Sequence, residues 1–537
     1  MKTKFTFIIF ILASFSLYSQ PVLLGSLEGN ETYFTGFNGK VYFASGTEIK
    51  VADTLSKSIR LLADLQEPVI SDKDYSRSFD VNLRAGYGTR DAPRFPVAGD
   101  FIYPLTKPYQ DSVSMWKIDK SETIVEKIGV FDSIYAYTAF KNDLYFAASK
   151  AGYGFQIWKA GQSGTISKLT NWDSAYSFYL EFVPGDDFLY FTHRSPCVGS
   201  EECTEYSSLY KSDGTAEGTI NVSDFEAPGK GWIGNLTFFK NKLYFIYADT
   251  IWTYDNENII PFLTDNGYYD EYNFSRILKV NNYLIYEIMH EMAPDNRLYS
   301  KEGGTGESVF LSDQYDFNNY FPVGEQLFFY SMADYYIGSF HKTDGTPGGT
   351  DEFIPLIGEY EVANRFQAVK EYLFYDVWEG YKDSYEVNYE LYQTDLTAAG
   401  SQKVQDIFGG SQSYDMANNF AEANGILFFT TGEKNTDIRA EPTQLYYYNP
   451  VSPVITAVKK SAAPLVAIYP NPAGNTCFLK ADVQGTISLT DALGKTVLED
   501  DFNQERMLDL SNLASGVYFA RLLTNENKVI VEKIVKR

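Results

Sequence analysis

Histidines and serine-based motifs are where nucleophilic chemistry would be sought in this chain. Its three histidines, His193, His290 and His341, lie in separate segments. No Gly-x-Ser-x-Gly, Walker-type or zinc-protease motif accompanies them. A catalytic triad needs a base held beside its nucleophile, so we predict that each histidine packs or forms hydrogen bonds. The chain is predicted to bind no metal or cofactor and not to be an enzyme.

Paired carboxylates are the second possible source of chemistry, because two Asp or Glu side chains can cleave a glycoside. Such residues can come from loops far apart in sequence. The chain holds 70 acidic residues, and nothing in the sequence selects two of them. A secreted carbohydrate-active enzyme, a hydrolase or lyase with carboxylates on loops, therefore stays as the alternative function.

Cysteine chemistry is limited to three residues. Cys197 and Cys203 lie in one short polar stretch, and we predict a disulfide between them because the protein is expected to be exported. Only His193 lies nearby as a further ligand, so a metal site is not expected there. Cys477 has apolar neighbours and is expected to be a small buried thiol.

The charge of the chain is strongly negative, at −25. Residues 21–464 account for all of this negative charge, with 35 basic against 61 acidic residues, a net of −26. Nucleic acids and anionic membranes would be repelled by such a surface. We therefore expect neither of them as a partner.

Export is indicated by the first residues of the chain. Two lysines precede an apolar run, Phe5–Leu17, that is too short to span a bilayer comfortably. This pattern predicts a cleavable signal peptide of residues 1–19, with Gln20 as the new N-terminus. No later run resembles a membrane span, so no transmembrane segment is expected in the mature chain.

A polar turn followed by Leu-Tyr-Phe, or by a close variant, recurs along the chain. The aligned aliphatic residues are Val41, Ile102, Leu144, Leu189, Leu243, Leu284, Leu327, Leu373 and Leu427. Their spacing is about 43 residues with insertions, which suits four short strands per repeat. The 43 Tyr and 40 Phe are also typical of β-sheet. We predict that residues 20–458 form a single β-propeller of about eight blades, with seven to nine admitted because terminal repeats often share strands.

Tight turns form a second recurring motif. The clearest copies are Asp213, Gly214 and Thr215, and Asp344, Gly345 and Thr346. Gly reaches positive φ without penalty and Asp bonds to nearby N–H groups, so turn chemistry explains these residues better than calcium binding. The repeats resemble the bacterial family named for Glu-Leu-Trp-x-x-Asp-Gly-Thr, and Leu396 departs from the pattern where the turn glycine is expected. The resemblance implies a propeller-like body and no assigned chemistry.

Three insertions, residues 71–97, 194–206 and 376–388, break the repeat. Insertions on a repeat scaffold form loops, often on the binding face. Aromatic rings in such loops can stack on a ligand, whereas rings at repeated strand positions are explained by packing. The candidate ligand residues are Tyr75, Tyr87, Trp378, Tyr381 and Tyr385. The leading prediction is a binding module for a glycan or protein; a passive surface-layer or adhesion component is the third possibility.

The composition shifts after residue 450, and residues 459–464 are predicted to be a linker. Residues 465–537 contain about seven short alternating runs, which predicts a small Ig-like β-sandwich. Three motifs follow in order: Ile-Tyr-Pro-Asn-Pro, Leu-Thr-Asp-Ala-Leu-Gly-Lys and Leu-Ala-Ser-Gly-Val-Tyr-Phe. Their key residues are Tyr469, Pro470, Asn471, Pro472, Gly494, Gly516 and Tyr518.

These motifs resemble the C-terminal sorting domain of the Bacteroidetes type IX secretion system. The resemblance implies that the secretion machinery is a partner, which carries the chain across the outer membrane by recognising residues 465–537. It also implies a secreted protein or one at the outer-membrane cell surface, and cleavage within residues 451–468. Anchored and released forms both stay open.

Overall fold

The computed structural model describes the chain almost entirely as β-strand. The described residues are 21–28, 31–70, 94–109, 112–172, 180–195, 206–226, 233–264, 272–290, 296–312, 317–334, 337–353, 361–380, 387–397, 400–404, 418–431, 444–450, 466–469, 473–491, 495–524 and 529–537. Ser19–Pro450 forms one compact unit, and Val451–Arg537 belongs to a second.

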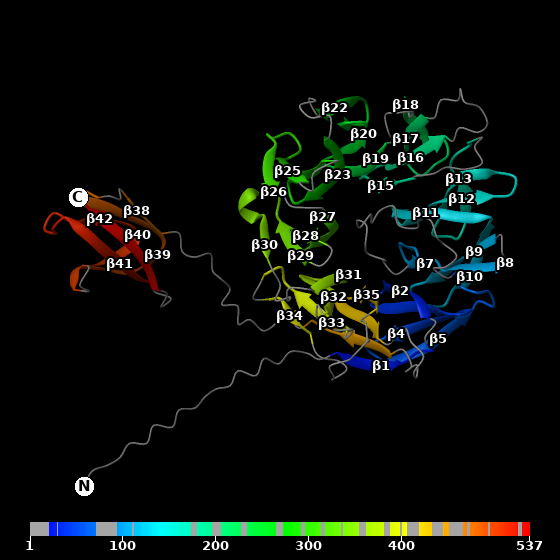
Figure 1. The fold of residues 1–537 in the computed structure, drawn as a ribbon, viewed down its shortest axis with the longest axis horizontal. Helices are drawn as coiled ribbons and strands as arrows, with labels where there is room; N and C mark the ends of the chain where they lie inside the picture. Colours follow the sequence, from blue (N-terminus) through cyan, green and yellow to red (C-terminus); the bar gives the residue numbers. More distant parts are fainter. Residues whose placement is uncertain are drawn as a thin grey trace, which may run out of the picture. The chain divides into compact units, whose positions relative to one another are not determined.

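The described part of the first unit contains nine sheets, which follow one another around a propeller-like ring (Figure 1). Most consecutive first strands contact one another, which places them at the centre of the ring. The first strands are β2 (Glu31–Phe37), β6 (Val97–Ala98), β11 (Ser133–Phe140), β15 (Phe182–Pro184), β19 (Gly234–Phe239), β23 (Tyr272–Val280), β27 (Phe317–Val323), β31 (Glu361–Val369) and β35 (Asn418–Ala423). Each sheet is named below by its first strand.

The second strands are β3 (Lys40–Ser45), β7 (Phe101–Ile102), β12 (Asp143–Lys150), β16 (Leu189–Ser195), β20 (Lys242–Tyr247), β24 (Tyr283–His290), β28 (Gln326–Asp334), β32 (Tyr372–Gly380) and β36 (Ile426–Thr431). The third strands are β4 (Glu48–Asp53), β9 (Ser112–Asp119), β13 (Gly154–Ala160), β17 (Tyr206–Ser212), β21 (Thr250–Tyr254), β25 (Arg297–Glu302), β29 (Ile337–Thr343), β33 (Val387–Thr394) and β37 (Gln444–Tyr448).

The outer strands are β5 (Ser58–Asp64), β10 (Val125–Phe131), β14 (Ile166–Lys168), β18 (Ile220–Glu226), β22 (Ile259–Thr264), β26 (Val309–Ser312), β30 (Asp351–Phe353), β34 (Gln402–Lys403) and β1 (Val22–Ser26). An extra strand, β8 (Leu105–Tyr109), pairs with β9, and a 3₁₀ turn, η2 (Pro347–Gly349), precedes β30. All neighbouring strands run antiparallel.

The repeat in the sequence corresponds to the second strand of each sheet. All nine aligned aliphatic residues lie there and are at most 4% exposed. A ring two residues further on often stacks on the ring opposite it in the third strand, with centroids 5.0–5.8 Å apart. These pairs are Phe191–Tyr210, Tyr286–Tyr299, Phe329–His341, Tyr375–Tyr392 and Phe429–Tyr446. The recurring aromatic residues are therefore packing residues.

The N-terminal strand closes the ring. β1 is the outer strand of the β35 sheet, where it pairs with β37, so both ends of the unit meet in one sheet. Terminal sharing was expected to leave about eight blades. In the described residues the shared strand completes a sheet rather than replacing one, and nine sheets lie at the upper end of the range of seven to nine.

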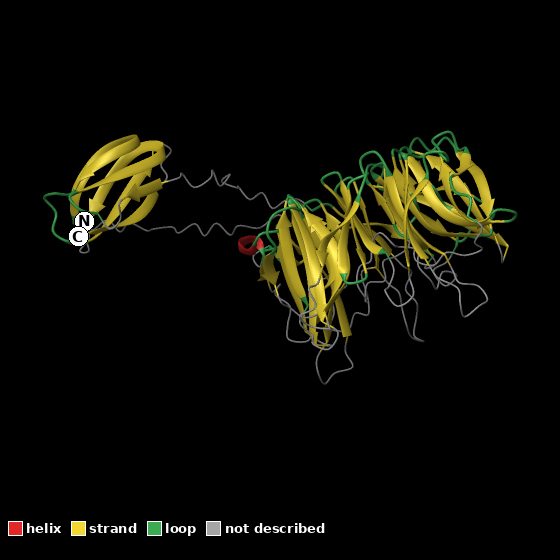
Figure 2. Cartoon of the chain, turned by 90° about the horizontal axis from the view of Figure 1, so that it is seen from above, coloured by secondary structure: helices red, strands yellow, loops and turns green. Residues whose placement is uncertain are grey.

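The antiparallel order gives the ring two faces. The turns from first to second strand and from third to outer strand lie on one face, here called the turn face; the other connections lie on the opposite loop face. Seen from the side, the described turns gather along one edge of the ring (Figure 2). The three insertions were predicted to form loops, but several of their described residues belong to strands. Residue 97 begins β6, 194–195 end β16, 206 begins β17, 376–380 end β32 and 387–388 begin β33.

The second unit is one five-stranded sheet in its described residues, with strand order β38-β39-β41-β42 and β40 paired with β39. The strands are β38 (Val466–Tyr469), β39 (Thr476–Thr490), β40 (Thr496–Asp509), β41 (Gly516–Thr524) and β42 (Val529–Lys536). We find five strands where about seven runs were predicted, because β39 and β40 are long and each joins two runs across a bulge. Cys477 is free and lies buried in the core, as expected.

Candidate functional site

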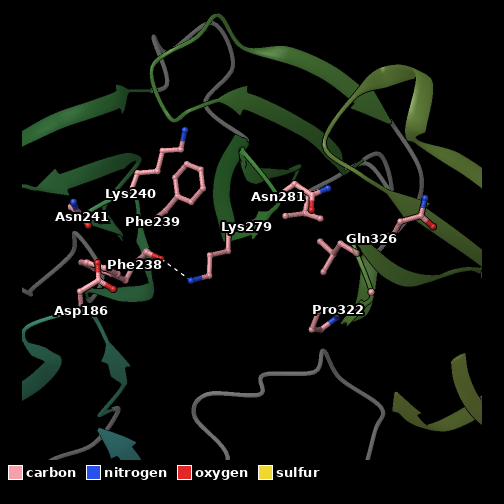
Figure 3. Close-up of a pocket in the computed structure, with 12 residues that line it drawn as sticks. Asp186, Phe238, Phe239, Lys240, Asn241, Lys279, Asn281, Pro322 and Gln326 are labelled. Carbon is pink, nitrogen blue, oxygen red and sulfur yellow. Dashed lines mark hydrogen bonds between the residues drawn. The ribbon is translucent and has the colours of Figure 1, made fainter. Parts of the chain in front are cut away.

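Four hairpin turns enclose a pocket on the turn face (Figure 3). They connect the first and second strands of the β15, β19, β23 and β27 sheets. The pocket has a volume of about 450 Å³, which is in the range of ligand sites in proteins. Its polar lining consists of Asp186, Lys240, Asn241, Lys279, Asn281 and Gln326. Phe238 and Pro322 are among its apolar residues.

The Lys240-Asn241 turn has the two left-handed residues that a two-residue hairpin loop needs. The angle φ is 48° at Lys240 and 60° at Asn241. Lys141 and Asn142 form the same turn in the β11 sheet, with φ of 47° and 69°. The backbone of the pocket turn is thus the ordinary backbone of the repeat, and any difference lies in the side chains.

In other turns of this kind, a side chain forms a hydrogen bond to the neighbouring sheet. The boundary between two neighbouring sheets is here called the seam. Lys141 Nζ donates to the backbone oxygen of Asp187 at 2.8 Å, and Asn281 Nδ2 donates to that of Glu325 at 2.8 Å. Lys240 occupies the same turn position as Lys141, and its ammonium lies 5.7 Å from the centre of the Phe239 ring. Within the described residues this ammonium makes no hydrogen bond or ion pair. At the pocket, the Lys240 ammonium is therefore available to form a hydrogen bond with a ligand.

Three turns between third and outer strands share one hydrogen-bond pattern. Asp344 Oδ1 accepts from Thr346 N at 2.8 Å and from Thr346 Oγ1 at 2.7 Å. Gly349 N then donates to Thr346 Oγ1 at 3.0 Å. The turns at Asp213 and Asp395 repeat these contacts. Each Asp is engaged by its own turn, so its presence needs no metal.

Gly349 is the most confined residue of this turn. A Cβ added there would lie 2.2 Å from the Asp344 carboxylate, whereas one added at the adjacent Gly348 meets nothing within 4 Å. We expect Gly349→Ala to lower the free energy of unfolding by about 2 kcal/mol and Gly348→Ala to change it by less than about 0.5 kcal/mol. Urea denaturation of the two variants measures the difference. Equal stabilities would show that the turn relaxes freely.

The residue after the turn Asp packs against the neighbouring sheet. A Cβ at Gly345, where φ is +96°, would lie 2.4 Å from the Tyr283 ring, and one at Gly214 would lie 2.4 Å from the Tyr145 hydroxyl. Leu396 takes this position in the β31 sheet with φ of 64° and is 1% exposed. It belongs to the apolar cluster shared with the β27 sheet. The departure from the repeat is thus a side chain that fills the seam.

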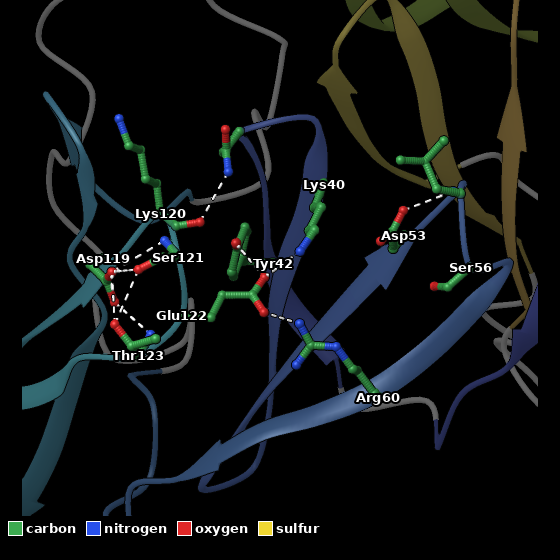
Figure 4. Close-up of polar contacts among 12 residues, drawn as sticks. Lys40, Tyr42, Asp53, Ser56, Arg60, Asp119, Lys120, Ser121, Glu122 and Thr123 are labelled. Atoms are coloured by element: carbon green, nitrogen blue, oxygen red, sulfur yellow. Dashed lines mark hydrogen bonds and ion pairs between the residues drawn. The ribbon is translucent and has the colours of Figure 1, made fainter.

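Glu122 joins the β2 sheet to the β6 sheet (Figure 4). It lies in the turn between β9 and β10, and its side chain is 10% exposed. Its carboxylate accepts from Lys40 Nζ at 2.9 Å and from the Tyr42 hydroxyl at 2.8 Å, and it pairs with Arg60. This acid is therefore a seam contact.

Most of the predicted ligand residues lie outside the described residues, as do the two cysteines predicted to form a disulfide. These are Tyr75, Tyr87, Tyr381, Tyr385, Cys197 and Cys203. Trp378 lies on β32, and the structure describes its backbone but not its side chain. None of them adjoins the pocket turns in sequence. The pocket was not predicted from the sequence.

The described histidines are packing residues. The His193 ring stacks on Trp172 with centroids 3.9 Å apart, and His341 stacks on Phe329 at 5.0 Å. Burial lowers the pKa of both to about 4, so both are neutral at pH 7. The side chain of His290 lies outside the description. Within the described ranges, no group of three or more His, Cys, Asp or Glu residues could hold a metal ion.

Two buried acids occupy one repeat position, three residues after the aligned leucine, in the β23 and β31 sheets. Glu287 Oε1 accepts from Asn296 Nδ2 at 2.9 Å, and Glu287 Oε2 lies 4.0 Å from Arg276 Nε. Asp376 is fully buried, with Oδ2 3.1 Å from Arg365 Nη1. Asp376 Oδ1 has no hydrogen-bond partner among the described residues. Sequence reasoning missed both acids, whose position is apolar or uncharged in the other second strands.

Asp376 makes stability depend on pH. Burial raises the pKa of its carboxyl from 3.8 to about 7, so between these values the folded chain binds a proton that the unfolded chain does not. The contribution of the protonated Asp376 carboxyl to the free energy of unfolding is therefore fully present below about pH 4 and is lost as pH rises through 7. Between pH 5 and 8 we expect the wild type to lose about 3 kcal/mol more stability than Asp376→Asn. Denaturant unfolding at both pH values measures this loss of stability. As a control, Asp132→Asn changes an exposed acid and should lose as much stability between pH 5 and 8 as the wild type does.

Tyr518 and Lys536 stabilise one corner of the sheet of the second unit, where β41 begins and β42 ends. The Tyr518 hydroxyl donates to the backbone oxygen of Ala514 at 2.8 Å. Lys536 is 6% exposed, and its ammonium donates to the backbone oxygens of Leu510 and Leu513. Of the remaining motif residues, Tyr469 lies on β38 and Gly516 begins β41, whereas Pro470, Asn471, Pro472 and Gly494 lie outside the described residues.

Residues 467–537 match the family model of the secretion system C-terminal sorting domain. This segment is a type IX sorting domain. Such a domain marks proteins that the type IX system exports to the cell surface or secretes, and it points to the type IX machinery as a partner. No curated protein matches the chain. None of the described helices is long and apolar enough to cross a membrane.

Several solved structures resemble the chain at low identity. PorZ, an essential surface component of the type IX system of Porphyromonas gingivalis, is 10% identical with a TM-score of 0.23, over 95% of this chain and 86% of PorZ. An oligogalacturonate lyase of Vibrio parahaemolyticus is 10% identical with a TM-score of 0.38, over 79% and 100%. The propeller domain of the Trilobed protease of Pyrococcus furiosus is 12% identical with a TM-score of 0.34, over 58% and 96%. At these values the similarities say nothing about activity.

Proposed function

We propose that this protein is an exported binding module. Its nine sheets act as the blades of one propeller, the sorting domain brings it to the cell surface or the medium, and it holds a glycan or protein ligand without cleaving it. The turn-face pocket is the observation that supports binding. There four turns converge, and Lys240 is available at a position whose side chains elsewhere seal the ring.

Binding and cleavage are separated by one assay. The chain from Gln20 to Arg537 is incubated with an array of immobilised polysaccharides, and retained protein and new reducing ends are measured in the same wells. Retention without new reducing ends is the expected result. New reducing ends would overturn the proposal and favour the carbohydrate-active enzyme. Absence of retention on every polysaccharide would remove the glycan as ligand.

A further inference from the structure

We infer that the turn-face pocket binds a neutral oligosaccharide and that the Lys240-Asn241 turn determines its specificity. This inference rests on the proposed binding function and names its ligand class and site. The pocket offers an ammonium group, amide groups and the Asp186 carboxylate around one space (Figure 3). A sugar hydroxyl donates one hydrogen bond and accepts others, so a ring of hydroxyls needs both kinds of partner.

The walls of the pocket are held in place before any ligand arrives. Lys279 Nζ donates to the backbone oxygen of Phe238 at 2.9 Å, which ties the β23 turn to the β19 turn. Asn281 Nδ2 ties the β23 turn to the β27 turn through Glu325. Side chains that are already fixed lose little conformational entropy when a ligand binds. Less of the free energy of the ligand's hydrogen bonds is then spent on ordering the pocket wall.

An apolar surface lies beside these polar groups. Phe238 stacks on Tyr190, with centroids 5.8 Å apart and an angle of 22°, so its ring is fixed in the pocket wall. Pro322 lines the pocket as well. Sugars present C–H faces between their hydroxyls, and a fixed ring beside hydrogen-bonding groups suits such a mixed surface.

Charge and backbone pairing argue against the other ligand classes. Residues 21–464 carry a net charge of −26, which repels acidic polymers over long range. An extended peptide is usually bound by pairing with a free strand edge. The pocket is instead formed by hairpin turns between strands that are already paired with each other. A neutral saccharide needs neither a basic surface nor a free edge.

The repeat supplies a variant that keeps the turn. Asn38–Gly39 and Asn424–Gly425 form the same turn in other sheets, with φ of 49° and 75°, and 53° and 73°. The double variant Lys240→Asn/Asn241→Gly therefore replaces the pocket turn with one that this chain already folds. Lys370→Asn/Glu371→Gly introduces the same two residues in a two-residue connection outside the pocket, between β31 and β32, and is the control.

Both double variants and the wild type are tested for retention on starch, xylan, mannan and mixed-linkage glucan, and on polygalacturonate and alginate. We expect the wild type to bind a neutral polysaccharide, the pocket variant to bind it at least about tenfold more weakly, and the control to match the wild type. Thermal unfolding of each variant shows that it is folded. Asp186→Asn, which keeps the size of the side chain and removes its charge, should also weaken binding.

Three other results would contradict the site, the ligand class or the binding function. Equal binding by the pocket variant places the site elsewhere, which overturns this inference and leaves the binding module standing. Retention on the acidic polysaccharides alone, or on none of the six, overturns the neutral class. New reducing ends overturn the binding module itself, so the two failures are distinguishable.

Discussion

Removal of residues 21–27 is expected to open the ring and to lower the free energy of unfolding by about 5 kcal/mol. β1 closes the β35 sheet by pairing with β37. Leu27, which is 7% exposed, packs in the apolar cluster at the same seam. Deletion removes these hydrogen bonds and this contact, and it exposes the edge of β37, which promotes association between copies.

Thermal unfolding and size-exclusion chromatography measure both effects. A synthetic peptide of residues 21–28, added in excess, should bind the open edge and recover most of the lost melting temperature. A peptide of the same composition in scrambled order is the control, because it cannot restore the register. A truncated chain that melts at the wild-type temperature and stays monomeric would show that closure by β1 contributes little.

The ring could be predicted from the sequence because its repeat marks buried positions. Val41, Leu144 and Leu427 are all completely buried in second strands, as are most of their counterparts. A residue of this kind cannot be exchanged for a polar one without a large cost, so the period survives in the sequence. The number of sheets was harder to predict, since β1 lies hundreds of residues from the strand with which it pairs.

The pocket could not be predicted, because it depends on what each turn residue contacts across a seam. Lys141 and Lys240 have the same neighbours in sequence, Phe before and Asn after, and nearly the same φ. Lys141 bonds to the next sheet, whereas Lys240 makes no such bond within the part of the chain that the structure describes. That difference is set by the partner sheet, so no local pattern carries it.

Buried charges were missed for a related reason. The sequence shows that the chain ends in basic residues, and a run of that kind is usually exposed. Strand alternation held the missing signal: Ile534 lies in the core, and Lys536 falls two residues later on the same face. Asp376 also follows an inward residue, Phe374, at the spacing of two.

Lys536→Ala is expected to block export. In the sorting domain the Lys536 ammonium is buried and donates to two backbone oxygens, of Leu510 and Leu513. Hydrogen bonds from a charged group contribute about 1.5–3 kcal/mol each, and a domain of this size has little stability to lose. Most copies should therefore carry an unfolded sorting domain. Cell fractionation with immunoblotting should show at least a roughly tenfold drop in protein at the surface and in the medium.

Two further variants test whether the Lys536 ammonium itself is needed and whether the effect is specific to this lysine. Lys536→Met keeps most of the apolar stem and removes the donor, so it should fail to be exported like Lys536→Ala. Lys533→Ala changes an exposed residue on the same strand and should be exported normally. Export of Lys536→Met at the wild-type level would show that packing of the stem suffices and that the two carbonyl contacts are dispensable. Loss of export with Lys533→Ala would instead indicate that the machinery reads positive charge on β42 rather than the fold of the corner.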